Sequence, residues 1–264
     1  MFIAALIFAA SFEPIGFWLA APIAYALFLR SIASRAYGPS LFAHVFIFAF
    51  VSSLLTLVWA GKYVGFVPLA FLALLHGLFY LPLALLRRYT SNVLLFVPAI
   101  LLIEEARARF PFAGFSWMRI AFSQADAPYL PIVSVGGVTF LSAWVLFISL
   151  LLTKFSTRRL GVVLALVLAP LLITQTPNLV GSISYAGVQG NTPAVGLEFN
   201  DRAKAVFNLH VDTTNELVSG KPDVIIWPEN AIDVDPFSNL DVRQSIESVT
   251  TSFSCLLYTS DAAD

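Results

Sequence analysis

The sequence predicts a polytopic α-helical membrane domain followed by an incomplete α/β domain. Only 12% of the residues are charged, 58% are hydrophobic and the mean hydropathy is +0.83, far above the range of soluble proteins. Charge is also divided unequally. Residues 1–181 contain 11 Lys/Arg and 4 Asp/Glu, whereas residues 182–264 contain 4 and 12. We therefore expect a transmembrane domain over 1–181 and an acidic soluble unit from residue 182.

Seven apolar segments are candidates for membrane-spanning helices. A span requires about 20 apolar residues. Three charge-poor runs are long enough by themselves, namely 41–61, 63–86 and 127–153. Three others, 14–29, 89–103 and 160–180, are shorter or contain polar residues. The N-terminal run, 1–12, is only half a span. The sequence thus predicts about seven helices.

Basic residues favour one orientation of these helices. They gather in alternate loops, at Arg30 and Arg35, then at Arg87 and Arg88, and then at Lys154, Arg158 and Arg159. The positive-inside rule assigns those loops to the cytoplasmic side. With seven spans, the unit after residue 181 then lies outside the cytoplasm. Glu13 would mark a turn on the same outer side.

The longest connection, residues 104–129, also lies on the predicted outer side. It is unusually aromatic for a loop and contains Phe110, Phe112, Phe115, Trp117 and Phe122. One interpretation is an aromatic belt at the membrane interface. The other is a lipid-facing entrance beneath the soluble unit. Glu104 and Glu105 follow an apolar run, so we expect them at the interface rather than in hydrocarbon.

The acidic unit begins with a strand–helix–strand pattern. Residues 183–191 form a first expected strand, residues 200–218 have helical spacing of apolar positions, and the β-branched run Val224–Ile226 is stopped by Trp227-Pro228. Such a βαβ unit implies a parallel sheet whose strand ends face a cleft. Glu229 follows the second strand directly. It is either a rigidly held general base or a solvated loop carboxylate.

At these residues the chain resembles the apolipoprotein N-acyltransferase family of bacteria. Val188-Gln189-Gly190-Asn191 with Pro193, followed by Trp227-Pro228-Glu229-Asn230-Ala231, is similar to the opening of the family's nitrilase-like domain. Gly114-Phe115-Ser116-Trp117 and Phe122-Ser123-Gln124 are similar to its membrane part. The resemblance covers roughly residues 1–250.

The resemblance implies a nitrilase-like α-β-β-α sandwich and a Glu-Lys-Cys mechanism. An acyl chain would pass from a phospholipid to a cysteine thioester, and then to the N-terminal cysteine of a diacylated lipoprotein. Glu229 matches the family's general base, and Trp117 matches a position implicated in substrate access. Phe199 is either an aromatic residue near the active site or an apolar residue preceding the helix. The implied location is the bacterial inner membrane, multi-pass, with the second domain on the periplasmic side.

The family's lysine and cysteine lie downstream of the residues that match. Lys204 and Lys221 precede Glu229, and Cys255 follows it too closely to match the nucleophile. We therefore expect residues 182–254 to be the N-terminal part of the nitrilase-like domain, and residues 255–264 to be an artefactual tail. A chain with these features would be an inactive, C-terminally truncated copy.

Composition also excludes several kinds of site. The acidic balance argues against a nucleic-acid partner. One cysteine and three scattered histidines give no disulfide framework and no recognisable metal site, and no cofactor is expected. Two rival functions are a membrane-tethered amidase, which would share the glutamate strand, and a non-enzymatic transporter or scaffold. The transporter would require ionisable groups inside the helical bundle, and these are almost absent from the predicted spans.

Overall fold

The computed structural model describes residues 1–111, 113–173, 180–191, 204–216 and 220–259. The chain divides into two compact units, Met1–Gln175 and Thr176–Asp264. The change in charge composition at residue 181 lies six residues after this division. Phe199 lies outside the described residues.

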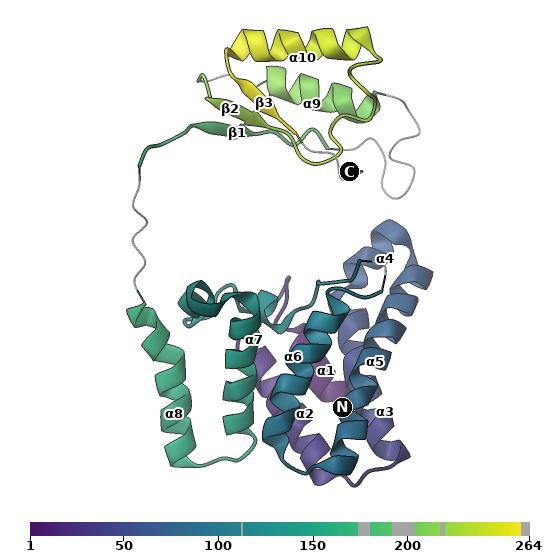
Figure 1. Cartoon of the computed structure of the whole chain (residues 1–264), viewed down its shortest axis with the longest axis vertical. Coiled ribbons are helices and arrows are strands. Elements are labelled where there is room, and N and C mark those ends of the chain that lie inside the picture. Colours follow the sequence, from purple (N-terminus) through teal and green to yellow (C-terminus); the bar gives the residue numbers. More distant parts are fainter. Residues whose placement is uncertain (112, 174–179, 192–203, 217–219, 260–264) are drawn as a thin grey trace. The chain divides into compact units, whose positions relative to one another are not determined.

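The first unit is a bundle of α-helices (Figure 1). Its helices, in chain order, are α1 (Phe2–Ala9), α2 (Ala20–Ser34), α3 (Pro39–Thr56), α4 (Val58–Val64), α5 (Phe66–Tyr89), α6 (Phe96–Arg107), α7 (Val133–Leu152) and α8 (Thr157–Leu168). Four short 3-10 helices accompany them: η1 (Val93–Leu95), η2 (Ile120–Gln124), η3 (Leu130–Ile132) and η4 (Ala169–Leu172). The long connection between α6 and α7 contains η2 and η3.

Three segments are long and apolar enough to cross a membrane: Pro39–Thr56, Phe66–Tyr89 and Leu130–Leu152. They correspond to the three long apolar runs of the sequence. The other four predicted spans correspond to helices of 8–15 residues, α1, α2, α6 and α8. The run 41–61 differs from expectation because Leu57 interrupts the helix, which ends at Thr56, and α4 begins at Val58. The protein is a membrane protein with a largely helical fold.

Aromatic side chains fill the centre of the helical unit. Phe28 of α2 stacks on Phe48 of α3, with ring centroids 4.2 Å apart. The hydroxyl groups of Tyr25 and Tyr80 are hydrogen-bonded at 2.7 Å and join α2 to α5. Because both tyrosines are almost fully buried, this bond satisfies polar groups that would otherwise be costly to bury.

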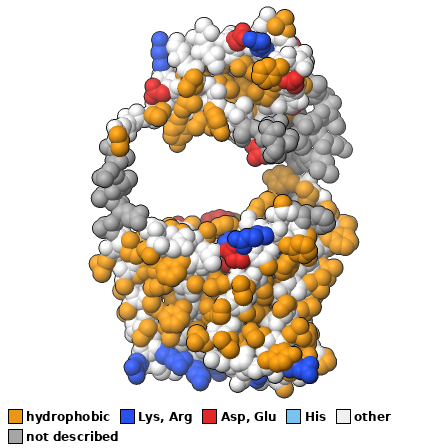
Figure 2. Space-filling view, viewed as in Figure 1, with side chains coloured by type: hydrophobic (Ala, Val, Ile, Leu, Met, Phe, Trp, Pro, Cys, Tyr) orange, Lys and Arg blue, Asp and Glu red, His pale blue; other side chains and the backbone are white. Residues whose placement is uncertain are grey.

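Basic residues from the end regions of α2 and α5 and from the connection after α7 lie at one end of this unit. Arg87 donates hydrogen bonds to the carbonyl oxygens of Ile32 and Ala33. Arg30 and Lys154 line a common pocket at the same end. Figure 2 shows Lys and Arg side chains along this edge and hydrophobic side chains over the side of the bundle. The loops that the sequence groups on one side of the membrane therefore meet at one end of the bundle.

The second unit contains a three-stranded parallel sheet and two helices. The strands are β1 (Tyr185–Gly187), β2 (Val224–Ile226) and β3 (Leu256–Tyr258), in the order β1-β2-β3. The helices are α9 (Ala205–Asn215), which follows β1, and α10 (Leu240–Phe253), which follows β2. The predicted parallel pairing of the first two strands is confirmed, with Ala186 opposite Ile225.

The third strand lies in the segment that is expected to be an artefactual tail, residues 255–264. The structure pairs Leu256–Tyr258 of this segment with β2. The backbone N–H of Trp227 also donates to the carbonyl oxygen of Tyr258 at 2.9 Å. Leu257 is apolar and packs against the small core of this unit. These residues therefore belong to the sheet.

Candidate functional site

The aromatic loop between α6 and α7 folds back onto the end of α6. Gly114 permits this contact, because it has φ +89° and a Cβ there would lie 2.2 Å from the backbone of Ala108. The next residue, Phe115, donates its backbone N–H to the carbonyl oxygen of Arg107 at 2.7 Å. The Gly-Phe-Ser-Trp segment thus begins with glycine because both the positive φ and the close approach to Ala108 require a residue without a Cβ.

Two buried charged side chains at the end of α6 hold the loop. Arg107 is 2% exposed, and its Nη1 donates to the carbonyl oxygen of Trp117 at 2.7 Å. Glu104 is 3% exposed, and its Oε1 accepts a hydrogen bond from the backbone N–H of Ile120 at 2.7 Å. Burial raises the pKa of Glu104, and the Ile120 hydrogen bond opposes that shift. The sequence predicts only that Glu104 lies at the interface rather than in hydrocarbon, and the structure adds that its side chain is enclosed by protein.

Glu105 links the same helix end to α7. Its carboxylate accepts hydrogen bonds from the Thr139 hydroxyl at 2.7 Å and from Arg119 at 2.8 Å, and it pairs with Arg109 at 2.6 Å. These partners, Thr139 foremost, lower the pKa of Glu105 to about 2. Glu105 is therefore ionised throughout the physiological pH range and pairs with two loop arginines.

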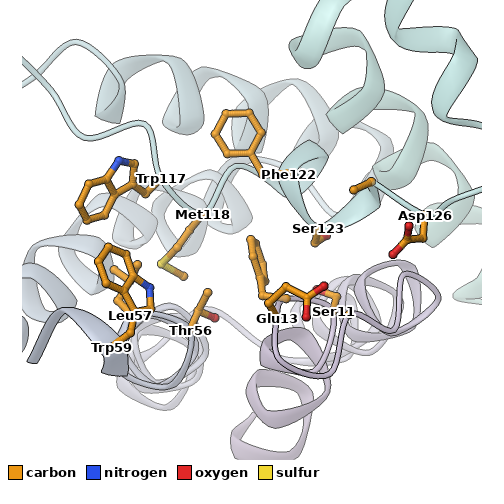
Figure 3. Close-up of a pocket in the computed structure, with 13 residues that line it drawn as sticks. Ser11, Glu13, Thr56, Leu57, Trp59, Trp117, Met118, Phe122, Ser123 and Asp126 are labelled. Atoms are coloured by element: carbon orange, nitrogen blue, oxygen red, sulfur yellow. The ribbon is translucent and has the colours of Figure 1, made fainter. Parts of the chain in front are cut away.

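A pocket of about 330 Å³ opens beneath this anchored loop. Its walls come from three segments far apart in the sequence, residues 11–16 after α1, residues 56–59 at the α3–α4 junction, and residues 117–126 of the loop. The ring centroids of Trp59 and Trp117 are 5.0 Å apart. Figure 3 shows these two indoles at one side of the pocket and the carboxylates of Glu13 and Asp126 at the other. The predicted residue Trp117 therefore lines a pocket, in contact with a second indole that sequence reasoning did not assign to the site.

Sequence reasoning also missed how the acidic side chains are arranged. All four acidic residues of the first 181 lie in segments predicted to be on the outer side, which was the available signal. It does not reveal that Glu104 and Glu105 hold the loop while Glu13 and Asp126 line the pocket. The hydrogen bonds of Glu104 and Glu105 to the loop and to α7 join residues 14–34 positions apart. Glu13 and Asp126, which line the same pocket, are more than 100 positions apart.

In the second unit, Glu229 lies in the turn directly after β2. The preceding residues fix this turn to the core. Trp227 is 2% exposed, and its indole N–H donates to the Thr214 hydroxyl of α9 at 2.9 Å. Asn230 has φ +58°, so the chain reverses immediately after the glutamate. Glu229 itself is exposed. The end of β2 thus presents an accessible carboxylate, which is compatible with both a general base and a solvated loop residue.

The Val-Gln-Gly-Asn segment packs against the same helix as Trp227. Gly190 follows β1, and a Cβ there would lie 2.5 Å from the backbone nitrogen of His210 in α9. Glycine is the residue that permits such a close backbone approach. Both motif segments of this unit are therefore held by α9, one by close packing and the other by the Trp227 hydrogen bond.

The predicted site residues lie in different parts of the chain. Trp117 belongs to the first unit and Glu229 to the second, and each is positioned by contacts within its own unit. Cys255 is partly buried and precedes β3. Within the described ranges, no group of three or more His, Cys, Asp or Glu side chains has an arrangement that could hold a metal ion.

Comparison with known proteins decides the family. A sequence model described as the apolipoprotein N-acyltransferase N-terminal domain matches residues 4–151. The chain belongs to the apolipoprotein N-acyltransferase family. The match covers α1 to α7 almost entirely, including the anchored loop and the pocket.

Curated relatives extend the similarity beyond the helical unit. The chain is 31% identical to the apolipoprotein N-acyltransferase of Mycolicibacterium smegmatis over 278 residues, covering 89% of this chain and 46% of that protein. It is 30% identical to those of Vibrio cholerae (81% and 42%) and Brucella melitensis (67% and 37%). An alignment over 89% of the chain must include part of the second unit. The chain spans less than half the length of these relatives.

Proposed function

We propose that this chain is the membrane domain and the first part of the catalytic domain of an enzyme that transfers an acyl chain from a phospholipid to the N-terminal cysteine of a diacylated lipoprotein. One observation supports this proposal most strongly. The same chain contains the helical unit that matches the family and an accessible glutamate after a strand of a parallel sheet. The names of the relatives support the acyltransferase chemistry.

Each unit has a distinct part in this proposal. The pocket lined by Trp117 receives the lipid substrate at the membrane surface, and Phe199 would add an apolar surface near the catalytic centre. Glu229 is the general base that takes the proton from a cysteine thiol. The thiolate attacks the carbonyl carbon of a phospholipid ester, the ester C–O bond breaks, and the lysophospholipid leaves as an alcohol after Glu229 returns the proton. The amino group of the acceptor cysteine then attacks the thioester, which forms an amide and releases the enzyme's cysteine, with the amine proton passing to its sulfur. Neither metal nor cofactor is needed for these steps.

The catalytic domain is proposed to be nitrilase-like and periplasmic. The parallel β1-β2-β3 sheet with its helices supports an α/β fold of that kind. The grouping of basic loops at one end of the bundle supports a cytoplasmic location for that end, in the bacterial inner membrane. With the seven spans that the sequence predicts, the second unit would lie on the opposite side.

We further propose that residues 1–264 by themselves form no acyl enzyme. Of the Glu-Lys-Cys set, these residues match only the glutamate, Glu229. A carboxylate by itself supplies neither the thiol nucleophile nor the cation that stabilises the oxyanion. Thioester formation would require the lysine and the cysteine that the relatives are expected to provide downstream.

A chimera tests the proposal. Residues 1–254 would be joined to the remaining catalytic domain of the Mycolicibacterium smegmatis relative, and the chimera would be incubated in lipid with acyl-labelled phospholipid. We expect a hydroxylamine-sensitive label on the chimera, none on residues 1–264, and label formation at least about a hundredfold slower on the Glu229→Gln chimera. Glu216→Gln, an exposed acid in the same unit, is the matched control and should retain the label.

Two outcomes would contradict the proposal. Labelling of the Glu229→Gln chimera at the control rate would show that Glu229 is not the base. Release of ammonia from small amides, without acyl labelling by phospholipid, would favour the membrane-tethered amidase. A thioester on residues 1–264 alone would contradict the proposed inactivity of this chain.

A further inference from the structure

One end of the helical unit has positive charge that no carboxylate offsets. The ends of α2 and α5 meet there, since Arg87 donates to the Ile32 carbonyl, and the residues after α7 join them around a shared pocket. The four acidic residues of the first 181 lie elsewhere, after α1, at the C-terminal end of α6 and in the α6–α7 loop. Seven basic residues belong to these helix ends and to the start of α8, and none is in an ion pair within the described ranges: Arg30, Arg35, Arg87, Arg88, Lys154, Arg158 and Arg159.

Two of these basic side chains line the pocket, which we call the basic pocket. It has a volume of about 440 Å³ and lies between the C-terminal end of α2, the 3-10 helix η1 and the residues after α7, and its charged lining residues are Arg30 and Lys154. Within the described residues, neither side chain donates a hydrogen bond or forms an ion pair. Arg35 and Arg87, by contrast, are engaged, with the Ser31 hydroxyl at 2.6 Å and the Ile32 carbonyl at 3.3 Å. Arg30 and Lys154 therefore remain available to a ligand.

A phosphate group suits this arrangement. Two cations that line one pocket repel each other, and a negative group between them is attracted to both. Guanidinium and ammonium groups are the side chains with which proteins bind phosphate, and a guanidinium does so through paired hydrogen bonds. The volume of the basic pocket is within the range of small-molecule sites, about 300–1,000 Å³, so a phosphate diester with its glycerol can enter.

The surroundings of the basic pocket indicate that this phosphate belongs to a membrane lipid. Phe155 lines the pocket and is 88% exposed, and Leu94 and Leu95, which follow the lining residue Val93, are 51% and 46% exposed. Such side chains can contact the hydrocarbon chains of a lipid, which a soluble phosphate lacks. Hydrophobic side chains cover the side of the bundle next to the basic end (Figure 2). Basic pockets between membrane helices at such a level bind anionic headgroups.

We propose that the basic pocket binds the phosphate group of an anionic phospholipid, with Arg30 and Lys154 as the phosphate-binding residues. Arg30 donates hydrogen bonds to the phosphate, Lys154 contributes a second positive charge, and Phe155 contacts the start of the acyl chains. The lipid thereby joins α2 to the α7–α8 connection. It is a bound lipid and not a substrate, since no residue of the proposed acyl transfer lines this pocket.

Two phospholipids with identical acyl chains test this proposal. Phosphatidylglycerol and phosphatidylcholine both contain a phosphate diester, but the choline group cancels its negative charge. The full chain in detergent would be titrated with each lipid, and the lipid-bound fraction would be measured by native mass spectrometry. The pocket variant is Arg30→Gln/Lys154→Gln, at two exposed positions. Arg88→Gln/Arg158→Gln is the matched control, because it removes the same charge from exposed positions of the same end that do not line the pocket.

We expect the unmodified protein to bind phosphatidylglycerol about tenfold more tightly than phosphatidylcholine, as two basic groups at a membrane surface would give. The preference should fall to about twofold or less in the pocket variant and stay near about tenfold in the control variant. It should also weaken as ionic strength rises, because salt screens exposed charges. Saturating phosphatidylglycerol should raise the Tm of the unmodified protein and of the control variant, and should raise that of the pocket variant much less.

Three results would overturn the proposal. Equal binding of the two lipids by the unmodified protein would exclude recognition of an anionic lipid, and this comparison does not depend on any variant folding. An equal loss of preference in the pocket and control variants would show a diffuse attraction to the whole basic end and no specific site. Displacement of the lipid by inorganic phosphate at equal concentration would reassign the pocket to a soluble anion. Lipid binding here requires no acyl transfer, so these results are separate from those of the chimera.

Discussion

Arg107 donates a hydrogen bond from Nη1 to the carbonyl oxygen of Trp117 across a 2.7 Å distance, although the arginine is 2% exposed and the tryptophan 47% exposed. A buried charge at the end of α6 thereby fixes the backbone of a residue whose side chain lines the pocket. The guanidinium carbon of Arg107 also lies 5.9 Å from the ring centroid of Phe115, whose ring is 5.0 Å from that of Trp117. The position of the Trp117 indole therefore depends on Arg107, which does not line the pocket.

Replacing Arg107 with methionine should release the loop. Methionine has an unbranched side chain like arginine but no donor, so the Trp117 carbonyl is left unpaired and we expect a loss of about 2–3 kcal/mol in the free energy of unfolding. Tryptophan emission should shift to longer wavelength as Trp117 becomes more mobile. Arg109→Met is the matched control, because the side chain of Arg109 is 72% exposed, and it should change stability by less than about 1 kcal/mol. Unchanged emission in Arg107→Met would show that the hydrogen bond does not position Trp117.

Glu104 should fix the loop through a single backbone amide. In Glu104→Ala the Ile120 N–H loses its acceptor, and its hydrogen exchange should become faster by about tenfold or more, equivalent to the loss of one buried charged hydrogen bond. In Glu104→Gln the side-chain carbonyl can still accept, so protection should largely return. The measurement is exchange mass spectrometry of peptides covering 115–124 in detergent. Equal exchange in all three proteins would contradict the assigned role.

Acid should weaken the contact between α6 and α7. The folded-state pKa of Glu105, about 2, is below its ordinary value of 4.5 because Thr139 and the two arginines stabilise the carboxylate. A lowered pKa contributes stability that is complete above about pH 4.5 and is lost as the pH falls toward 2. We expect Tm to fall more between pH 6 and pH 3 in the unmodified protein than in Glu105→Gln, which has no proton to take up there. Parallel melting curves would exclude Glu105 as the group responsible.

Hydropathy predicted the long helices well, and it failed where apolar segments change direction. The runs around α3, α5 and α7 were recognisable because each is long enough to span a bilayer. The break at Leu57 was not, since the residues on both sides of it are apolar and the 3.6-residue period carries little information when nearly every position is hydrophobic. The start of α2 at Ala20 was missed for the same reason.

Candidate site residues could be singled out from the sequence only where a local sequence pattern surrounds them. Glu229 was recognisable because the β-branched run before it and the proline beside it define a strand end. Trp117 was recognisable as part of an aromatic loop. By contrast, the pocket joins residues near positions 13, 56 and 120, and no local pattern reports such long-range contacts. Burial of Glu104 was unexpected because its partner is a backbone amide 16 residues later.

Thr214 should stabilise the second unit through its bond to Trp227. Thr214 is fully buried, and Thr214→Val keeps the shape of the side chain while leaving the indole N–H without its acceptor. We expect the free energy of unfolding to fall by about 1–3 kcal/mol, the cost of an unsatisfied buried donor. The test is denaturant unfolding followed by Trp227 emission in a protein lacking its other tryptophans. Thr251→Val, at an exposed position of α10, should have little effect.

Substitution of Glu229 should separate chemistry from folding. The Glu229 side chain is exposed in its turn, whereas the strand and the tryptophan before it are held by the core. Glu229→Gln should therefore change the free energy of unfolding by less than about 0.5 kcal/mol, as is usual for surface positions. The same change in the chimera with the Mycolicibacterium smegmatis relative should lower acyl-enzyme formation by at least about a hundredfold, the typical contribution of a general base. Thr214→Val should show the converse, lower stability with acyl-enzyme formation largely retained below its melting temperature. If Glu229→Gln instead lost stability and activity together, the glutamate would be a structural residue of the turn, and the general base would have to be sought elsewhere.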